Sequence, residues 1–548
     1  MDLSSQLNTV VLGLRSGSKT HADRVAKLKH VAFYLPQVGN PQNVWLLLHE
    51  LALSPGLLDG LDTVLFATDA MTFAANRKAR ISDPRLPFAD WEAAIVRTAY
   101  HLPPLFGLIV LSGLCAQGSS REDALPQFVM EVAQNPEMAV LAAGCLSRAQ
   151  WSPKVRAVFP VLSPACRSLL LSAIVKVVYS PETIKLTSLD DFGGWSRTLA
   201  RLLELAPFAE LAQFLDTLHL FLRTAVTYNS LDALKKLAFG VTIQLEGLMA
   251  QLVANRELGE HRQYILGGVV RALQPLAFVI EAVGSQFNSY QFVFYSVVDT
   301  LQALAPPARI QILRLLGDHW GYGKAVDSDV AAGDLLFFLE ICEPLVSTLS
   351  HAESEAFVVP IAERFLDPIP PKITLGPAVF EAAHSVMLAY LATHPTRRFT
   401  KSRAALAYFD KLVSLFPAYV SGRQLKSAVA AILRAVSLDQ TAQVLDRLFL
   451  LAKQTIPGTP IKSGEGEPPT LRAALVSTLL YGVTQYTPAP QMAVWLHHIG
   501  SMVPEPYSPS SQAERDFLIQ NFRDVVTNLG DVSGVGIRWF FGEGWSRL

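Results

Sequence analysis

Apolar residues recur at helical spacing along almost the whole chain, and proline or glycine interrupts them at intervals. In the stretch 195–225, leucine and phenylalanine return every three or four residues, which places them along one face of an α-helix. Pro207 divides this stretch into two helices, because proline cannot donate the hydrogen bond that continues the helical backbone. The same pattern returns in 409–437, where Pro417 and Gly422 mark the break. The sequence therefore predicts amphipathic helices of roughly 12–20 residues joined by short turns.

Each amphipathic helix must bury its apolar face against a neighbour, and this requirement limits the fold. Alternating segments rich in valine, isoleucine and threonine are scarce, so we expect no β domain. In a chain of 548 residues, helix pairs stacked side by side bury such faces economically. The sequence predicts an all-α fold, either a HEAT- or armadillo-like helical-repeat α-solenoid or an irregular multi-helix superhelix. One or two compact irregular helical domains are the alternative, because no repeat of fixed period is visible.

Composition agrees with extensive burial and argues against several classes of protein. Half of the residues are hydrophobic and 17% are charged, which excludes a mostly disordered chain. The net charge is -1 and no basic stripe is visible, so we expect no nucleic-acid partner. The four cysteines show no C-x-x-C spacing, which argues against a disulfide scaffold or a zinc site and favours small core residues. We therefore expect no metal and no cofactor.

Neither the N-terminus nor the most apolar segment is typical of membrane insertion. Residues 1–17 lack a basic region before their apolar stretch, so we expect no secretory signal peptide. The most apolar run, 102–116, is shorter than the ~20 residues of a membrane-spanning helix and begins with two prolines after Leu102. We predict a buried helix there, and membrane contact that is only peripheral.

A stretch rich in proline and glycine at 455–470 is the clearest candidate for a linker. It would separate a helical-repeat body, residues 1–454, from C-terminal helices over 471–541. Residues 542–548 contain Gly542 and Gly544, and we predict a flexible tail there because glycine restricts the backbone least.

No stretch carries a strong catalytic motif. The segment "GLRSGSKT" at 13–20 has its glycines too close together for a phosphate-binding loop, and we predict a turn between two helices. The segment "GDHWGYGK" contains Asp318, His319 and Tyr322, which would suit an active site, but its glycines favour a helix C-terminus and the turn that follows. We therefore expect no catalytic residues. A peroxisomal matrix enzyme with an unfamiliar helical site around these three residues is the alternative.

The last three residues carry the most specific functional signal in the sequence. Ser546, Arg547 and Leu548 follow the small–basic–leucine pattern of a C-terminal peroxisomal targeting signal. A receptor that recognises such an end holds the carboxylate with positioned hydrogen-bond donors. Arg547 would supply a cation, and Leu548 would fill an apolar pocket. We predict that this tripeptide binds a peroxisomal targeting-signal receptor. The competing interpretation is a cytosolic helical-repeat adaptor whose ending is accidental.

Two stretches of the chain resemble the fungal peroxin-8 family of peroxisome-biogenesis proteins. They are "VGNPQNVWLLLHELALSPGLL" at 38–58, where an Asn-Pro turn leads into a leucine-rich helix, and the ending Ser546–Leu548. The resemblance implies a non-enzymatic, lumenal protein that is held peripherally at the peroxisomal membrane. It also implies contact with the cargo receptor, and a link between the docking and RING ubiquitin-ligase complexes of membrane peroxins. The N-terminal type 2 signal of some members is not matched, because four residues instead of five separate Val25 from His30.

Overall fold

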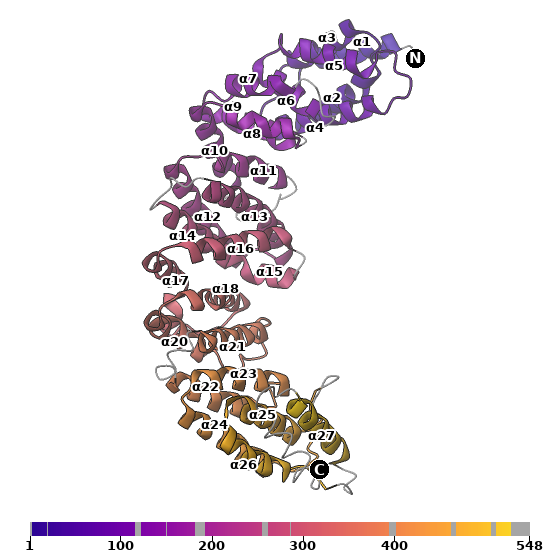
Figure 1. Cartoon of the computed structure of the whole chain (residues 1–548). Coiled ribbons are helices and arrows are strands. Elements are labelled where there is room, and N and C mark those ends of the chain that lie inside the picture. The colour runs from indigo at the N-terminus through magenta and orange to yellow at the C-terminus, as the bar shows by residue number, and fades with distance from the viewer. Residues whose placement is uncertain are drawn as a thin grey trace. The chain divides into compact units, whose positions relative to one another are not determined.

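The computed structural model describes residues 3–18, 20–115, 122–149, 151–180, 192–254, 261–284, 287–393, 402–461, 467–505 and 511–527. The chain divides into two compact units, Met1–Leu304 (unit 1) and Ala305–Leu548 (unit 2). Helices make up nearly all of the described backbone (Figure 1). Among the residues described, extended pairing is limited to one antiparallel bridge between Pro460 and Thr470. The predicted all-α fold is confirmed.

In unit 1, most helices pack on the helix two places further along the chain. Thus α2 packs on α4, α4 on α6, α3 on α5, α11 on α13, and α12 on α14. This repeated stacking of alternate helices is the arrangement of a helical-repeat α-solenoid. The helices of unit 1 are α1 Leu3–Arg15, α2 His21–Tyr34, α3 Pro41–Ala52, α4 Leu61–Ala79, α5 Phe88–Ala99, α6 Pro104–Leu114, α7 Leu125–Val132, α8 Pro136–Arg148, α9 Pro153–Val161, α10 Pro164–Val178, α11 Phe192–Leu203, α12 Phe208–Tyr228, α13 Leu231–Ala254, α14 His261–Leu273, α15 Ala277–Val283 and α16 Asn288–Ala303, with the short 3-10 turns η1 Leu35–Gln37, η3 Glu122–Ala124 and η6 Gln274–Leu276.

Unit 2 continues the same pattern in its own stack. Here α18 packs on α21, α21 on α23, α23 on α25, and α25 on α27 (Figure 1). A cavity opens beside α21 and α23 of this row. The helices of unit 2 are α17 Pro306–Gly321, α18 Asp329–Leu345, α19 His351–Glu353, α20 Val359–Arg364, α21 Gly376–Ala392, α22 Ser402–Leu415, α23 Gly422–Ala435, α24 Leu438–Gln454, α25 Leu471–Tyr486, α26 Ala489–Gly500 and α27 Gln512–Thr527, with the 3-10 turn η7 Val346–Thr348 and the π-helical turn η8 Ser354–Val358.

The helix breaks fall where proline and glycine predicted them. Helix α11 ends at Leu203 and α12 begins at Phe208, directly after Pro207. Helix α22 ends at Leu415, and α23 begins at Gly422. Proline cannot continue a helix, and both breaks let the chain reverse so that the next apolar face packs back on the stack.

A glycine sets the close approach of α11 and α13, which pack extensively on each other. A Cβ atom at Gly247 would stand 2.5 Å from the backbone oxygen of Ala200 in α11. That separation is shorter than van der Waals contact, so only glycine fits there without movement of the backbone. The backbone of α11 at Ala200 therefore lies directly against Gly247 of α13, and no side chain fits between the two helices at this point.

The apolar segments pack into the core of unit 1. In α6, Leu108, Ile109 and Val110 have no exposed surface, which confirms the buried helix predicted at 102–116. In the described part of the chain, the segment His261–Val283 is long and apolar enough to cross a membrane, and 78% of its apolar window is buried inside the protein. Burial of that degree is typical of a core helix.

The predicted linker at 455–470 is anchored at both of its described ends. The backbone N–H of Leu471 donates to the oxygen of Thr459 at 2.9 Å. Helix α25, which follows the stretch, packs on both α23 and α24, which precede it. The predicted division into 1–454, 455–470 and 471–541 stays a prediction, and the predicted tail, 542–548, lies outside the described residues.

Candidate functional site

The predicted receptor-binding tripeptide lies beyond the last described residue, Thr527. Ser546, Arg547 and Leu548 therefore have no structural account, and their targeting role stays a prediction. Among the described residues, the candidate sites lie at helix termini and in the spaces between helices.

The alternative catalytic cluster at Asp318, His319 and Tyr322 forms a helix end. Asp318 and His319 lie in the last turn of α17, and Tyr322 follows that turn with 89% of its side chain exposed. Arg364 donates from Nη1 to the backbone oxygen of Trp320 at 3.0 Å. The guanidinium thus satisfies a carbonyl that the helix leaves open at its C-terminus. The three residues form the predicted turn, and the Tyr322 ring points into solvent rather than toward a shared cavity.

The cysteines lie in the core and carry no sign of reactivity or metal binding. Cys115, Cys145, Cys166 and Cys342 are all buried and free. Burial raises the pKa of the Cys145 thiol to about 12, so it stays protonated and is a poor nucleophile. No group of three or more His, Cys, Asp and Glu side chains that could hold a metal ion occurs among the described residues.

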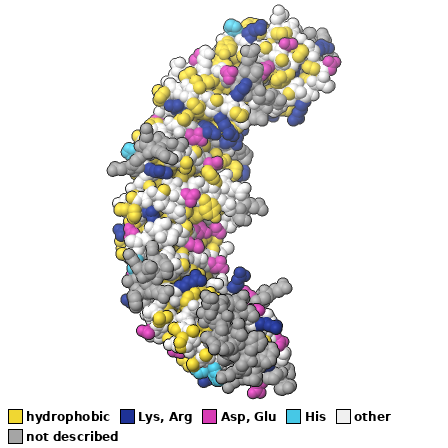
Figure 2. Space-filling model, viewed as in Figure 1, with side chains coloured by type: hydrophobic (Ala, Val, Ile, Leu, Met, Phe, Trp, Pro, Cys, Tyr) yellow, Lys and Arg dark blue, Asp and Glu magenta, His cyan; other side chains and the backbone are white. Residues whose placement is uncertain are grey.

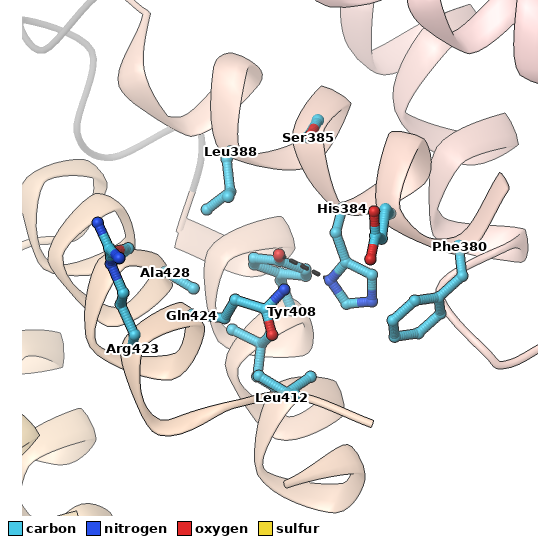
Figure 3. A pocket seen from close by; sticks show the side chains of 12 residues that line it. Phe380, His384, Ser385, Leu388, Tyr408, Leu412, Arg423, Gln424 and Ala428 are labelled. Carbon is cyan, nitrogen blue, oxygen red and sulfur yellow. Dashed lines mark hydrogen bonds between the residues drawn. The ribbon is translucent and has the colours of Figure 1, made fainter. Parts of the chain in front are cut away.

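A cavity of about 350 Å³ opens between α21, α22 and α23 (Figure 3). We call it the α21–α23 pocket. Its walls are mostly apolar and come from all three helices and from the turn before α23: Phe380, Leu388, Tyr408, Leu412, Val420 and Ala428. Concave, largely apolar cavities of this size are the usual form of binding sites in proteins.

One buried polar pair lies in the wall of the pocket. His384 Nδ1 and the Tyr408 hydroxyl are 2.9 Å apart, and Figure 3 shows the bond between α21 and α22. Burial lowers the pKa of His384 to about 4 and raises the pKa of Tyr408 well above its ordinary value. At neutral pH the imidazole is therefore neutral and the phenol keeps its proton, so the Tyr408 hydroxyl donates to Nδ1. The bond joins the two helices, and it leaves His384 Nε2 buried without a hydrogen-bond partner.

Two charged side chains stand at the rim of the pocket. Glu381 and Arg423 both line it and are both exposed. Neither forms an ion pair with another described residue. Glu381 comes from α21 and Arg423 from α23, and Figure 3 shows Arg423 across the cavity from Phe380. The pocket thus combines a mostly apolar interior with one exposed cation and one exposed anion from different helices.

A local sequence signal exists for only one corner of this pocket. Ser421 and Gln424 form a capping box at the start of α23, with the Ser421 N–H donating to Gln424 Oε1 at 2.8 Å. The S-x-x-Q spacing that signals such a box is visible in the sequence. The pairing of His384 with Tyr408 joins residues on different helices and carries no local signal.

A second polar site in unit 2 centres on a fully buried carboxylate, and its hydrogen bonds come from the chain itself. The Glu514 carboxylate of α27 has no exposed surface. It accepts from Arg472 Nε at 2.8 Å, from the Gly458 N–H at 2.7 Å and from the Thr470 hydroxyl at 3.0 Å. Arg472 also donates from Nη2 to the backbone oxygen of Met502. These bonds, which we call the Glu514 clasp, fasten α25, α27 and both described ends of the predicted linker to one another.

Large apolar side chains are also exposed on helices that pack together in unit 1. Phe239 of α13 and Phe292 and Tyr295 of α16 are each about half exposed or more, at 48%, 54% and 63%. Figure 2 shows apolar side chains interspersed among few charged ones on the visible face of the molecule.

Two comparisons of the sequence lead to the same group of proteins. The family described as the PEX8 central TPR-like domain matches residues 298–392, which include α17 to α21. The "Peroxisomal membrane protein PEX17" of Yarrowia lipolytica is 24% identical, over 98% of this chain and 96% of that protein. The chain is similar to proteins of the peroxin-8 family. The resemblance predicted from 38–58 and Ser546–Leu548 is therefore confirmed.

Further similarities to this peroxin-8-like chain cover less of the proteins concerned. "Peroxisomal biogenesis factor 8" of Pichia angusta is 22% identical over 57% of this chain and half, 50%, of that protein. Among solved structures, the karyopherin Kap121p bound to the SUMO protease Ulp1p aligns with 99% of this chain and 57% of its own, at 11% identity and a TM-score of 0.42.

Proposed function

We propose that this chain is a non-enzymatic peroxin that acts as a scaffold in the import of proteins into the peroxisomal matrix. The observation that carries the proposal is the alignment with a fungal peroxisomal membrane protein over 98% of this chain and 96% of that relative. The match to the PEX8 central domain supports the same role. Both of the relatives described above are named for the peroxisome or its biogenesis and not for a reaction.

The proposed partners are the targeting-signal receptor and the membrane peroxins of the docking and RING ubiquitin-ligase complexes. Ser546, Arg547 and Leu548 are the residues we propose for the receptor. Exposed apolar side chains on stacked helices, such as Phe292 and Tyr295, supply surface for the other partners, since helical stacks present broad contact faces. In this proposal the chain works on the lumenal side and is held at the membrane through its partners.

The structure gives the scaffold proposal support over the enzyme alternative. The cluster at Asp318, His319 and Tyr322 ends a helix, and its tyrosine is turned to solvent. The His384–Tyr408 pair lies at the wall of a cavity, but each group is used by the other. Active sites bring several reactive groups together around a substrate, and neither arrangement does so.

Localisation in living cells tests the targeting part of the proposal. The chain carries a fluorescent protein at its N-terminus and is compared with a twin that lacks residues 546–548. We expect the full chain to co-localise with a peroxisomal marker and the twin to be diffuse. Arg547→Lys keeps the small–basic–leucine pattern and should stay peroxisomal, whereas Arg547→Glu should not. If the twin and the Arg547→Glu variant are recruited as well as the intact chain, the tripeptide is not the address.

A further inference from the structure

Several polar groups that line the α21–α23 pocket are already bonded to other groups of the protein, whereas His384 Nε2 is buried without a hydrogen-bond partner. The Tyr408 hydroxyl and His384 Nδ1 bind each other at 2.9 Å. The Gln424 side chain accepts from the Ser421 N–H as part of the capping box. A ligand that entered the pocket would therefore meet mainly apolar walls, formed by residues such as Phe380 and Leu412. The interior suits an apolar group, because a polar one would lose its hydration and find few partners on these walls.

The rim of the pocket has the opposite character. Glu381 and Arg423 are exposed, and neither is ion-paired to another residue of the described chain. They belong to different helices, α21 and α23, which both line the cavity. A ligand that complements both must carry an anion and a cation that are separated by an apolar part.

We propose that the α21–α23 pocket binds an amphipathic peptide segment of a partner protein. The segment inserts one or two large apolar side chains, spaced as on one helical turn, between α21 and α23. An acidic residue of the segment faces Arg423, and a basic residue faces Glu381. Helical segments commonly bind to grooves in this way, through apolar anchors at i and i+4. The inference stands on the pocket alone and does not depend on the import role.

The direct test uses synthetic peptides and the full chain. Four fluorescein-labelled 16-residue helical peptides share one Leu and one Phe at i and i+4. They differ in their flanks, which are acidic then basic, basic then acidic, neutral, or acidic on both sides. Fluorescence anisotropy measures their affinities. We expect one of the two mixed orders to bind about 3- to 10-fold more tightly than the neutral peptide, because two exposed ion pairs each contribute modestly.

Substitutions in the pocket show whether the peptide binds there. Leu388 lines the pocket and is partly exposed, and Leu388→Lys should weaken binding at least about 10-fold by placing a charge against the apolar segment. Leu450→Lys is the matched control, because Leu450 is 52% exposed on α24 and does not line the pocket. Ser385→Trp fills the cavity from a half-exposed wall and serves as a second blocking variant. Circular dichroism and melting confirm that each variant is folded.

Charge reversal provides the sharpest outcome. The double variant Glu381→Arg with Arg423→Glu should prefer the mixed peptide of opposite order, with a reversal of the affinity ratio. The proposal is overturned if no peptide binds, if Leu388→Lys and Leu450→Lys bind equally well, or if the double variant keeps the original preference. Sedimentation of the chain alone adds one more outcome. Self-association that Leu388→Lys abolishes would make a second copy the occupant and would also overturn the proposal.

Discussion

The Glu514 clasp and the α21–α23 pocket lie in the same unit, and both form where helices of one stack meet. In the clasp, a buried carboxylate receives three donors from Arg472, Gly458 and Thr470. In the pocket, an apolar void stays open, and the charges of Glu381 and Arg423 stand exposed at its mouth. The hydrogen bonds of the clasp are complete within the chain, whereas the two charges at the pocket have no ion-pair partner among the described residues.

The difference shows how a helical stack separates stability from recognition. A buried charge is tolerated only when hydrogen bonds replace the water it has lost, so every donor of the clasp is needed by the fold. A charge at an open rim keeps its hydration and contributes little to folding. An exposed residue such as Glu381 is therefore available to bind a partner and contributes little to stability. A buried glutamate such as Glu514 contributes much to stability and is not available to a partner.

The largest expected difference in stability is between two variants that each replace a glutamate by alanine, one in the clasp and one at the pocket. Glu514→Ala should lower the free energy of unfolding by about 3–5 kcal/mol, because it leaves the Arg472 side chain, which is only 13% exposed, without its carboxylate. Glu381→Ala should change it by less than about 0.5 kcal/mol, because Glu381 is exposed. Urea unfolding of the full chain measures both. Equal losses at the two positions would remove the distinction between a closed and an open site.

A smaller difference is expected for leucines cut back to alanine. Leu479 of α25 is fully buried, and Leu479→Ala should cost about 4 kcal/mol through lost burial and the empty cavity it leaves. Leu412 is 2% exposed in the pocket wall, and Leu412→Ala should cost about 2 kcal/mol, because it widens a space that water already reaches. The same urea unfolding experiment compares them, and a larger loss for Leu412 would contradict an open pocket.

The smallest effect concerns pH and His384. Its pKa is lowered to about 4 by burial, below the value of about 6.5 expected in the unfolded chain. The unfolded chain therefore binds the proton first as pH falls, and folding stability declines between pH 6.5 and about 4. From pH 7 to pH 5.5 the loss should be about 1 kcal/mol. Parallel unfolding curves at the two pH values measure it.

The matched control for the pH effect is His384→Gln, which cannot titrate in this range. The variant starts from its own stability at pH 7, so only the change with pH is compared with that of the parent chain. We expect its stability to fall by about 1 kcal/mol less than the parent's between pH 7 and pH 5.5. Identical pH dependence in the two proteins would show that His384 is not buried in its neutral form.

The helices and their breaks could be predicted from the sequence because their signals are local. The leucine spacing in 195–225 and Pro207 specify where α11 ends and α12 begins, whatever the rest of the chain does. The same holds for Gly422 at the start of α23. The buried helix at 102–116 was predictable because an apolar run of that length is too short to span a membrane and must be covered by protein.

The pocket and the clasp could not be predicted, because both depend on contacts between distant residues. Tyr408 meets His384 across 24 positions, and Glu514 meets Gly458 across 56. The tilt and spacing of neighbouring helices decide such contacts, and helical periodicity says nothing of them. The stretch 455–470 shows the limit of prediction from local sequence. Its composition predicted a linker, but it did not predict that Glu514 would bind the described ends of that linker. The role of Ser546–Leu548 stays a prediction, because it lies outside the described residues.

The measurement that tests the import role most directly follows a cargo protein rather than this chain. A fluorescent protein that ends in Ser-Lys-Leu is expressed in cells that lack the chain, beside a marker of the peroxisomal membrane. The account predicts a diffuse cytosolic cargo in cells that still contain marker-positive membranes, and punctate cargo once the chain is restored. Cargo that is imported normally without the chain would contradict a role in matrix-protein import.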